Sequence, residues 1–221
     1  MKDLPSQRGA RKVRAMVAEG EHERQDFKYS ISDARKIARS ISAFANHSGG
    51  RLLIGVKDNG TIAGVRNDED IYVVELAAGR YCVPPVEVTF TAYSVDGTTR
   101  VIVADIPAAE PPGISVAEAD GRLRAYYRVA DENIAAPPLM TGAWRRRRAG
   151  TGSATVGNLH ARVLAWCGDG APADARTAAL ALHVTESAVA DAIETLAAIG
   201  VLRFGHTAAG FILAPQKNLD E

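Results

Sequence analysis

Residues 40–60, SISAFANHSGGRLLIGVKDNG, constrain the fold more than any other part of the chain. The segment continues an apolar pattern of helical spacing and stops at Asn46 and a Gly-Gly pair. It then resumes as a short apolar run that ends at Asp-Asn-Gly. Asn and Gly adopt the left-handed conformation that ends helices, and Asp-Asn-Gly is typical of a tight turn. The pattern predicts a helix followed directly by a buried strand.

The surrounding segments predict the rest of an N-terminal domain. SISD, at residues 30–33, has the form of a capping box and predicts a helix over 32–46. Further predicted elements are a strand at 51–56 with a hairpin partner at 61–65, a helix from Asp68 to Pro84, a β-hairpin at 86–107 and a strand at 122–130. Helices covering one face of a mixed sheet predict an α+β domain.

The C-terminal part has a different pattern. A helix at 158–167 is followed by two helices that meet at a turn at His183 and Val184, the second capped by Thr185. A β-hairpin at 201–213 follows, which predicts a small winged helix-turn-helix domain. The expected organisation is a basic arm at 1–18, the α+β domain at 19–144, an Arg-rich linker at 145–157 and the winged-helix domain at 158–215.

Composition excludes several classes of protein. None of the apolar runs in the 221 residues approaches the roughly 20 needed to span a bilayer. The N-terminus lacks the apolar core of a secretory signal. Two isolated cysteines and scattered histidines favour a reducing cytoplasm over a disulfide framework or a zinc site. The net charge is zero, but residues 151–221 carry −3 and the remainder +3.

Four segments carry a resemblance to a known family: EGEHERQDFK, ISAFANHSGGRLLIGVKDNGTIAGV, VIVADIP and AYYRVADENIAA. Together, over residues 19–136, they resemble the Schlafen-type Alba-like domain. The second segment is the most specific. The resemblance implies a bacterial protein that binds nucleic acid, DNA or RNA, and acts in regulation, often with a C-terminal winged helix.

Some Schlafen relatives are RNA endonucleases, which implies a second activity. By motif position, the three metal-binding and catalytic acids would be Glu21, Asp26 and Asp58, around Mg²⁺ or Mn²⁺. The chain departs from the motif, because Asp26 replaces the usual Glu and Lys57 stands where many members have an acid. Glu19 and Glu23 also compete with Glu21 for the first position.

The same acids have a structural interpretation. Glu21 would then be solvated, Asp26 would pair with Lys28 or a nearby arginine, and Asp58 would serve its turn. The Asn46–Gly50 junction follows a helix rather than preceding one, so a turn is favoured over a phosphate cradle. Asn46 and His47 contacting a ligand is the alternative.

Basic residues indicate where a polyanion could bind. The run Arg145, Arg146, Arg147 and Arg148 cannot share one buried face, so it should stay solvated and contact phosphates. Further expected nucleic-acid contacts are Lys28 and, beside Tyr126, the strand residues Arg122, Arg124 and Arg128. Arg11, Lys12 and Arg14 could add an N-terminal arm. The alternative is a charged linker that keeps the chain soluble.

The predicted recognition helix contains Glu186, Asp191 and Glu194 and no basic residue. An acidic surface opposes a polyanion, so this helix is expected to pack on the first domain, to self-associate or to contact protein. Three hypotheses follow: backbone binding of nucleic acid without a cofactor, a metal-dependent ribonuclease, and a homodimeric interaction module without nucleic acid. None of the three involves a membrane.

Overall fold

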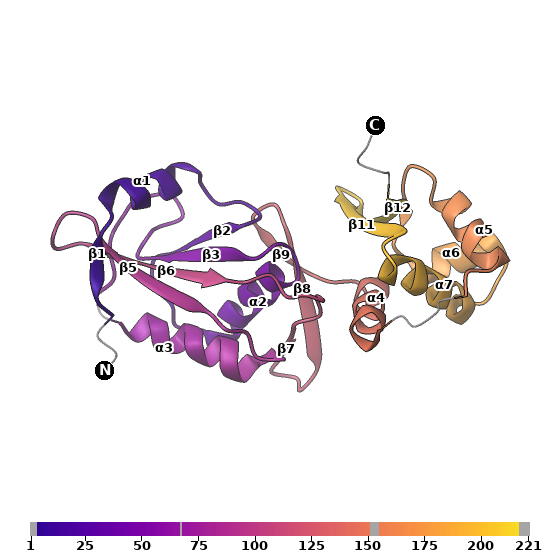
Figure 1. Ribbon diagram of the computed structural model, residues 1–221, viewed down its shortest axis with the longest axis horizontal. Coiled ribbons are helices and arrows are strands. Elements are labelled where there is room, and N and C mark those ends of the chain that lie inside the picture. Colours follow the sequence, from indigo (N-terminus) through magenta and orange to yellow (C-terminus); the bar gives the residue numbers. More distant parts are fainter. Residues whose placement is uncertain (1–3, 67, 151–154, 217–221) are drawn as a thin grey trace. The chain divides into compact units, whose positions relative to one another are not determined.

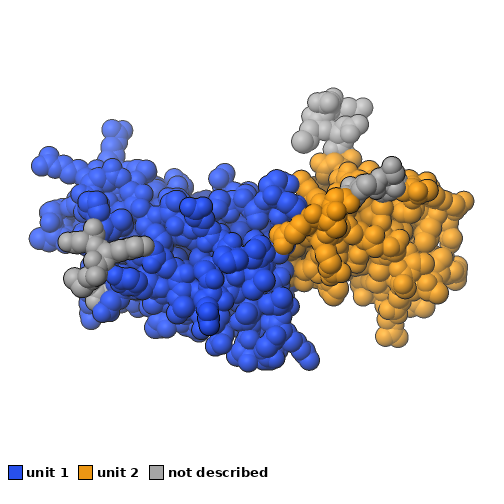
Figure 2. All heavy atoms as spheres, turned by 60° about the horizontal axis from the view of Figure 1, so that its bottom comes forward, with its two compact units in different colours: residues 1–135 blue, residues 136–221 orange. Residues whose placement is uncertain are grey.

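The structure is a computed structural model that describes residues 4–66, 68–150 and 155–216 (Figure 1). The chain divides into two compact units, Met1–Ala135 and Ala136–Glu221, coloured separately in Figure 2. The boundary therefore precedes the expected linker at 145–157. Positions 1–3 of the expected N-terminal arm and 151–154 of the expected linker lie outside the described residues.

Unit 1 is built around a five-stranded sheet with the order β1-β5-β6-β3-β2. The strands of this sheet are β1 (Ser6–Arg8), β2 (Gln25–Lys28), β3 (Gly50–Ile54), β5 (Thr89–Ser94) and β6 (Arg100–Ile106). β2 runs parallel to β3 and β1 runs parallel to β5, whereas β6 is antiparallel to both of its neighbours. The predicted α+β class with a mixed sheet is confirmed.

Helices lie on both faces of this sheet, not on one as expected (Figure 1). α2 (Ala34–Ala45), α3 (Glu69–Leu76) and the π-helix η1 (Ala77–Tyr81) cover the face that carries Leu52 and Ile54. α1 (Ala10–Ala18) covers part of the opposite face, where Val13 and Met16 pack with Leu53 and Val103. Because successive strand residues point to opposite faces, β3 contributes to both cores.

The predicted hairpin partner at 61–65 is wrong. This segment forms only an isolated bridge between Val56 and Ile62, and β3 pairs instead with β2 and β6. The reason lies at Gly55, whose carbonyl accepts hydrogen bonds from the backbone N–H groups of Ala63 and Gly64. Its φ of +96° and its close approach to the Gly64 backbone both require glycine. The segment 61–65 thus contacts the chain just after the C-terminal end of β3 and does not pair along the strand.

A second sheet in unit 1 lies beside α2. Its order is β4-β7-β8-β9, and its strands are β4 (Cys82–Val83), β7 (Ser115–Ala117), β8 (Leu123–Val129) and β9 (Glu132–Ala135). The Asn46 side chain fastens this sheet to the end of α2. Its Oδ1 accepts from the N–H groups of Gly113 and Ile114 at 2.7 Å, and its Nδ2 donates to the carbonyls of Ile114 and Tyr126. Asn46 is 3% exposed, so it is a structural residue.

Unit 2 is a small helical domain with a three-stranded sheet of order β10-β12-β11. Its elements are α4 (Pro138–Ala149), α5 (Asn158–Cys167), β10 (Ala171–Pro172), α6 (Ala175–Leu182), α7 (Glu186–Ala198), β11 (Leu202–Thr207) and β12 (Gly210–Pro215). Thr185 caps α7 as predicted, by accepting from the Ala188 N–H at 3.2 Å. Within the described residues, no helix is both long and apolar enough to cross a bilayer.

Candidate nucleic-acid interface

The carboxylates singled out at the start of the first domain lie at the edge strand β2. Asp26 is 6% exposed and forms an ion pair of 2.6 Å with Lys28 Nζ. Its other oxygen lies 3.7 Å from the guanidinium of Arg128 on β8. A carboxylate buried to this degree is stable only when it is paired, and two cations pair it here.

Arg128 is 1% exposed, so the expectation that it lies on an exposed basic surface is wrong. Its guanidinium lies over the Phe44 ring and donates to Asn133 Oδ1 at 2.8 Å. It also donates to the carbonyls of His22 and Gln25. Arg124, Tyr126 and Arg128 lie on the same side of β8. This side of the strand becomes more buried from Arg124 toward Arg128. Arg128 therefore connects the second sheet to β2.

Glu21 is also part of this network. Its Oε1 accepts a 2.8 Å hydrogen bond from the Phe27 N–H. Burial and a hydrogen bond with Asp26 raise the pKa of Glu21. The structure thus brings Glu21 and Asp26 together, in a setting where both also interact with Lys28 and Arg128.

Asp58 lies in the exposed turn after Val56 and lines a shallow hollow that Lys28 also lines. Among the described residues, no group of three or more His, Cys, Asp or Glu side chains could hold a metal ion. Two carboxylates already neutralised by a lysine and an arginine do not fit the oxygen-rich donor set of Mg²⁺ or Mn²⁺. The geometry therefore favours the structural interpretation of Asp26.

Basic side chains gather instead along the exposed side of α2 and the start of β8. Arg39 makes a two-pronged contact with Glu118, at 2.9 and 2.7 Å, and the pKa of Glu118 is lowered mainly by this contact. Glu118 also interacts with Arg124, which pairs with Asp120 at 3.2 Å. We call this area the β8–α2 surface; it consists of Arg35, Lys36, Arg39, Arg122 and Arg124.

The α2 members of this surface were missed at the sequence level. Arg35, Lys36 and Arg39 occupy the side of the helix opposite its buried positions Ile37 and Ile41. The same helical pattern that predicted the core would have identified them. Arg35 stacks over the Tyr81 ring at 4.8 Å, so the surface also has an aromatic neighbour.

The arginine run 145–148 is helical, not an irregular linker. It forms the last turn of α4, which packs against α7 through Leu139 and Gly142. A Cβ at position 142 would overlap the carboxylate of Glu194, so glycine permits this close approach. Arg146 points at α7 and pairs with Asp191 at 2.5 Å and Glu194 at 3.0 Å.

The other three arginines of the run are exposed. Consecutive helical residues lie about 100° apart, so with Arg146 directed at α7 the side chains of Arg145, Arg147 and Arg148 spread over the outer side of α4. They also complement the negative end of the helix dipole, which is a structural reason for arginine at these positions. α4 thus presents cations on its outer side.

The acidic residues of α7 have a structural partner in the same unit. Asp191 and Glu194 lie one turn apart and hold α4 through Arg146. Val189, Ala192, Ile193 and Leu196 face the unit's core. From Val189 to Ala198, Asp191 is the one described residue of α7 that is exposed. The predicted recognition helix is therefore covered along most of its length.

The geometry describes an α+β domain in which a helix runs through a buried Asn and a Gly-Gly pair into a central strand. Residues 21–137 match the family model described as Schlafen, AlbA_2. The match covers more than half of the chain, so the chain belongs to this family. Membership indicates a nucleic-acid-related role.

Among solved structures, the chain is similar to the DIP2311 protein from Corynebacterium diphtheriae, with 22% identity and a TM-score of 0.46. The match covers 90% of this chain and 37% of that one, so the chain spans little more than a third of the length of that protein. None of the curated proteins compared with the chain matches it.

Proposed function

We propose that the protein binds the phosphate backbone of nucleic acid through exposed arginines on two surfaces. One is the β8–α2 surface of unit 1, and the other is the outer side of α4 in unit 2. Of the eight basic residues predicted to bind nucleic acid, Lys28 and Arg128 pair with the buried Asp26, and Arg146 holds α4 on α7, so these three are left out. Arg124 and Arg39 also pair with carboxylates, Asp120 and Glu118, but about half of each arginine side chain remains exposed. Binding rests on the exposure of Arg122, Arg124, Arg145, Arg147 and Arg148, with Lys36, Arg39 and the half-buried Arg35 added on α2.

The observation that carries the proposal is the orientation of the four arginines on α4: one contacts α7 and three lie on the outer side. Arg146 anchors the helix on α7, and this anchor holds the other three arginines on a packed element, not on a free chain. Exposed cations held on a rigid element release counterions when they contact phosphates, and they carry no base readout by themselves.

We further propose that residues 158–215 act as a winged helix-turn-helix that does not read DNA through α7. The order of helices, strand and hairpin in unit 2 supports this assignment. α7 carries Glu186, Asp191 and Glu194 without a basic residue, and α4 covers it. The role of unit 2 would then be to position the arginines of α4.

The test is fluorescence anisotropy of labelled 20-nucleotide single strands and duplexes between 50 and 200 mM salt. The expected result is affinity that falls steeply with salt and differs little between unrelated sequences of equal length and equal base composition. DNA and RNA are compared in parallel, each as single strands and as duplexes. The exposed arginines alone do not discriminate DNA from RNA. Affinity that is insensitive to salt, or the absence of binding at 50 mM salt, would overturn the proposal.

The ribonuclease alternative is tested with labelled 20-nucleotide RNA single strands and duplexes. Incubation with Mn²⁺ or Mg²⁺ should leave them intact if Asp26 is structural. Cleavage that Asp26→Asn and Asp58→Asn both abolish, while the variants remain folded, would establish the nuclease.

A further inference from the structure

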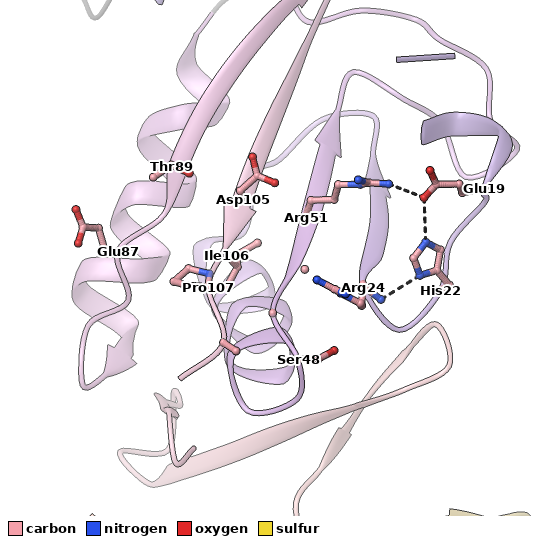
Figure 3. Close-up of a pocket in the computed structure, with 13 residues that line it drawn as sticks. Glu19, His22, Arg24, Ser48, Arg51, Glu87, Thr89, Asp105, Ile106 and Pro107 are labelled. Carbon is pink, nitrogen blue, oxygen red and sulfur yellow. Dashed lines mark hydrogen bonds and ion pairs between the residues drawn. The ribbon is translucent and has the colours of Figure 1, made fainter. Parts of the chain in front are cut away.

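A pocket of about 790 Å³ opens on the face of the five-stranded sheet that α1 covers only in part (Figure 3). Glu19, the residue that ends α1, lies at its border. Beyond this point the sheet face carries polar side chains in place of the core residues Leu53 and Val103. A volume of this size is typical of pockets for small ligands.

A row of side chains in register across four strands runs under the pocket, and Arg51, Asp105 and Thr89 of this row line it. Gln25 on β2 is paired with Arg51 on β3, Arg51 with Asp105 on β6, and Asp105 with Thr89 on β5. Paired residues on adjacent strands point to the same face, so the four side chains form one line. Figure 3 shows Asp105 and Arg51 between Thr89 on one side and Glu19 and His22 on the other.

Two members of the row are already satisfied by the protein. Arg51 donates to Gln25 Oε1 at 2.6 Å and pairs with Glu19 at 2.5 Å. Asp105 differs, because no side chain in the described ranges donates a hydrogen bond to it. Although the Asp105 side chain is exposed at the pocket, partial desolvation by its surroundings raises its pKa despite the attraction of Arg51 and Lys12. The pocket therefore holds a carboxylate that can accept from a ligand.

The opposite rim carries positive charge. The guanidinium of Arg24 makes no hydrogen bond or ion pair with another described residue. The exposed hydroxyl of Ser48 lines the same rim, and Pro107 adds an apolar surface between the two sides. A ligand that matches this pocket combines an anionic group with a group that donates hydrogen bonds.

We propose that this pocket binds a single nucleotide unit, with its phosphate at Arg24 and Ser48 and the donor edge of its base at Asp105 and Thr89. This proposal rests on the proposed nucleic-acid binding and adds a base-selective subsite to it. A guanine base offers two adjacent donors, N1–H and the N2 amino group, to one carboxylate. Uracil offers one donor between two carbonyl oxygens, which repel a carboxylate. The pocket selects guanine over uracil.

The test is calorimetric titration of the full chain with GMP, UMP and inorganic phosphate. GMP is expected to bind about tenfold more tightly than UMP, as one well-placed pair of hydrogen bonds allows. Asp105→Asn should remove this preference, and Thr89→Ala should reduce it. Arg24→Gln should weaken both nucleotides equally. The matched control is Glu132→Gln, an exposed carboxylate elsewhere in unit 1, which should change neither affinity.

Equal affinities for GMP and UMP, no binding of either, or a preference that survives Asp105→Asn in a folded protein would overturn the proposal. Near-ultraviolet circular dichroism of the six tyrosines, all in unit 1, verifies that each variant is folded. If Asp105→Asn does not fold, the test rests on Thr89→Ala. A folded Thr89→Ala protein with an unchanged preference for GMP over UMP would then overturn the proposal. Oligonucleotide binding without GMP binding defeats this inference alone, whereas GMP binding without oligonucleotide binding defeats the backbone proposal alone.

Discussion

Arg128 in unit 1 and Arg146 in unit 2 illustrate two ways in which a predicted ligand-binding arginine serves the fold. Each pairs with carboxylates of its own unit, Arg128 with Asp26 and Arg146 with Asp191 and Glu194. The Arg128 side chain is 1% exposed, whereas that of Arg146 is 38% exposed. Burial therefore separates the two, although both look alike in the sequence.

The difference has an energetic consequence. Removing one partner of a buried pair leaves a charge without compensation in a poorly solvated site and costs several kcal/mol. Solvent screens an exposed pair, whose loss typically costs 0 to about 1 kcal/mol. The two units can be followed separately, because both tryptophans (Trp144 and Trp166) lie in unit 2 and all six tyrosines lie in unit 1.

The largest effect is expected for Asp26→Asn. It removes the carboxylate that pairs with the buried Arg128 guanidinium, so the free energy of unfolding of unit 1 should fall by about 3 to 5 kcal/mol. Denaturant unfolding, monitored by the near-ultraviolet circular dichroism of the tyrosines, measures this loss of free energy. Asp58→Asn, in an exposed turn, is the matched control and should cost less than about 0.5 kcal/mol. Equal small losses in both variants would contradict a structural Asp26.

Asn46→Ala should come next. The change leaves the N–H groups of Gly113 and Ile114, and two carbonyls, without their partner in a buried site. The expected loss for unit 1 is about 2 to 3 kcal/mol by the same tyrosine measurement. Asn59→Ala is the control, because the Asn59 side chain accepts a hydrogen bond from the Thr61 N–H in an exposed turn. A stable Asn46→Ala protein would show that the second sheet is held by other contacts.

Arg146→Gln should have a much smaller effect, about 1 kcal/mol or less, because its ion pairs are partly exposed. Tryptophan fluorescence during unfolding reports on unit 2 and thus measures it. Arg145→Gln, one position away on the outer side of α4, should leave the stability of unit 2 unchanged. A loss for Arg146→Gln as large as that for Asp26→Asn would break the comparison between the two arginines.

The smallest effect concerns acid pH. The contact with Arg39 lowers the pKa of Glu118, so this carboxylate stabilises unit 1 above its unfolded-state pKa. The contribution is lost as the pH falls through the lowered folded-state pKa. Glu118→Gln should therefore flatten the acid end of the stability profile of unit 1 and leave unit 2 unaffected. An unchanged profile would mean that the Arg39–Glu118 contact is too screened by solvent to matter.

Local patterns predicted the elements well but not their partners. The apolar spacing of α2 and the alternation of β5 and β6 are properties of neighbouring residues, and both were confirmed. The burial of Arg128 depends on β8 meeting β2, which lie about 100 residues apart in the sequence. The row from Gln25 to Thr89 depends likewise on the order of four strands, which no local pattern specifies.

The most direct test of the account is the slope of log affinity against log salt concentration for one labelled single strand. Arg145→Gln with Arg148→Gln removes two exposed cations of α4 and should reduce the magnitude of the slope by about 1 to 2. Arg66→Gln with Arg203→Gln removes two exposed cations outside the two proposed surfaces and should leave the slope unchanged. Equal slopes for both double variants and the unchanged protein would contradict the claim that the outer side of α4 contacts phosphates.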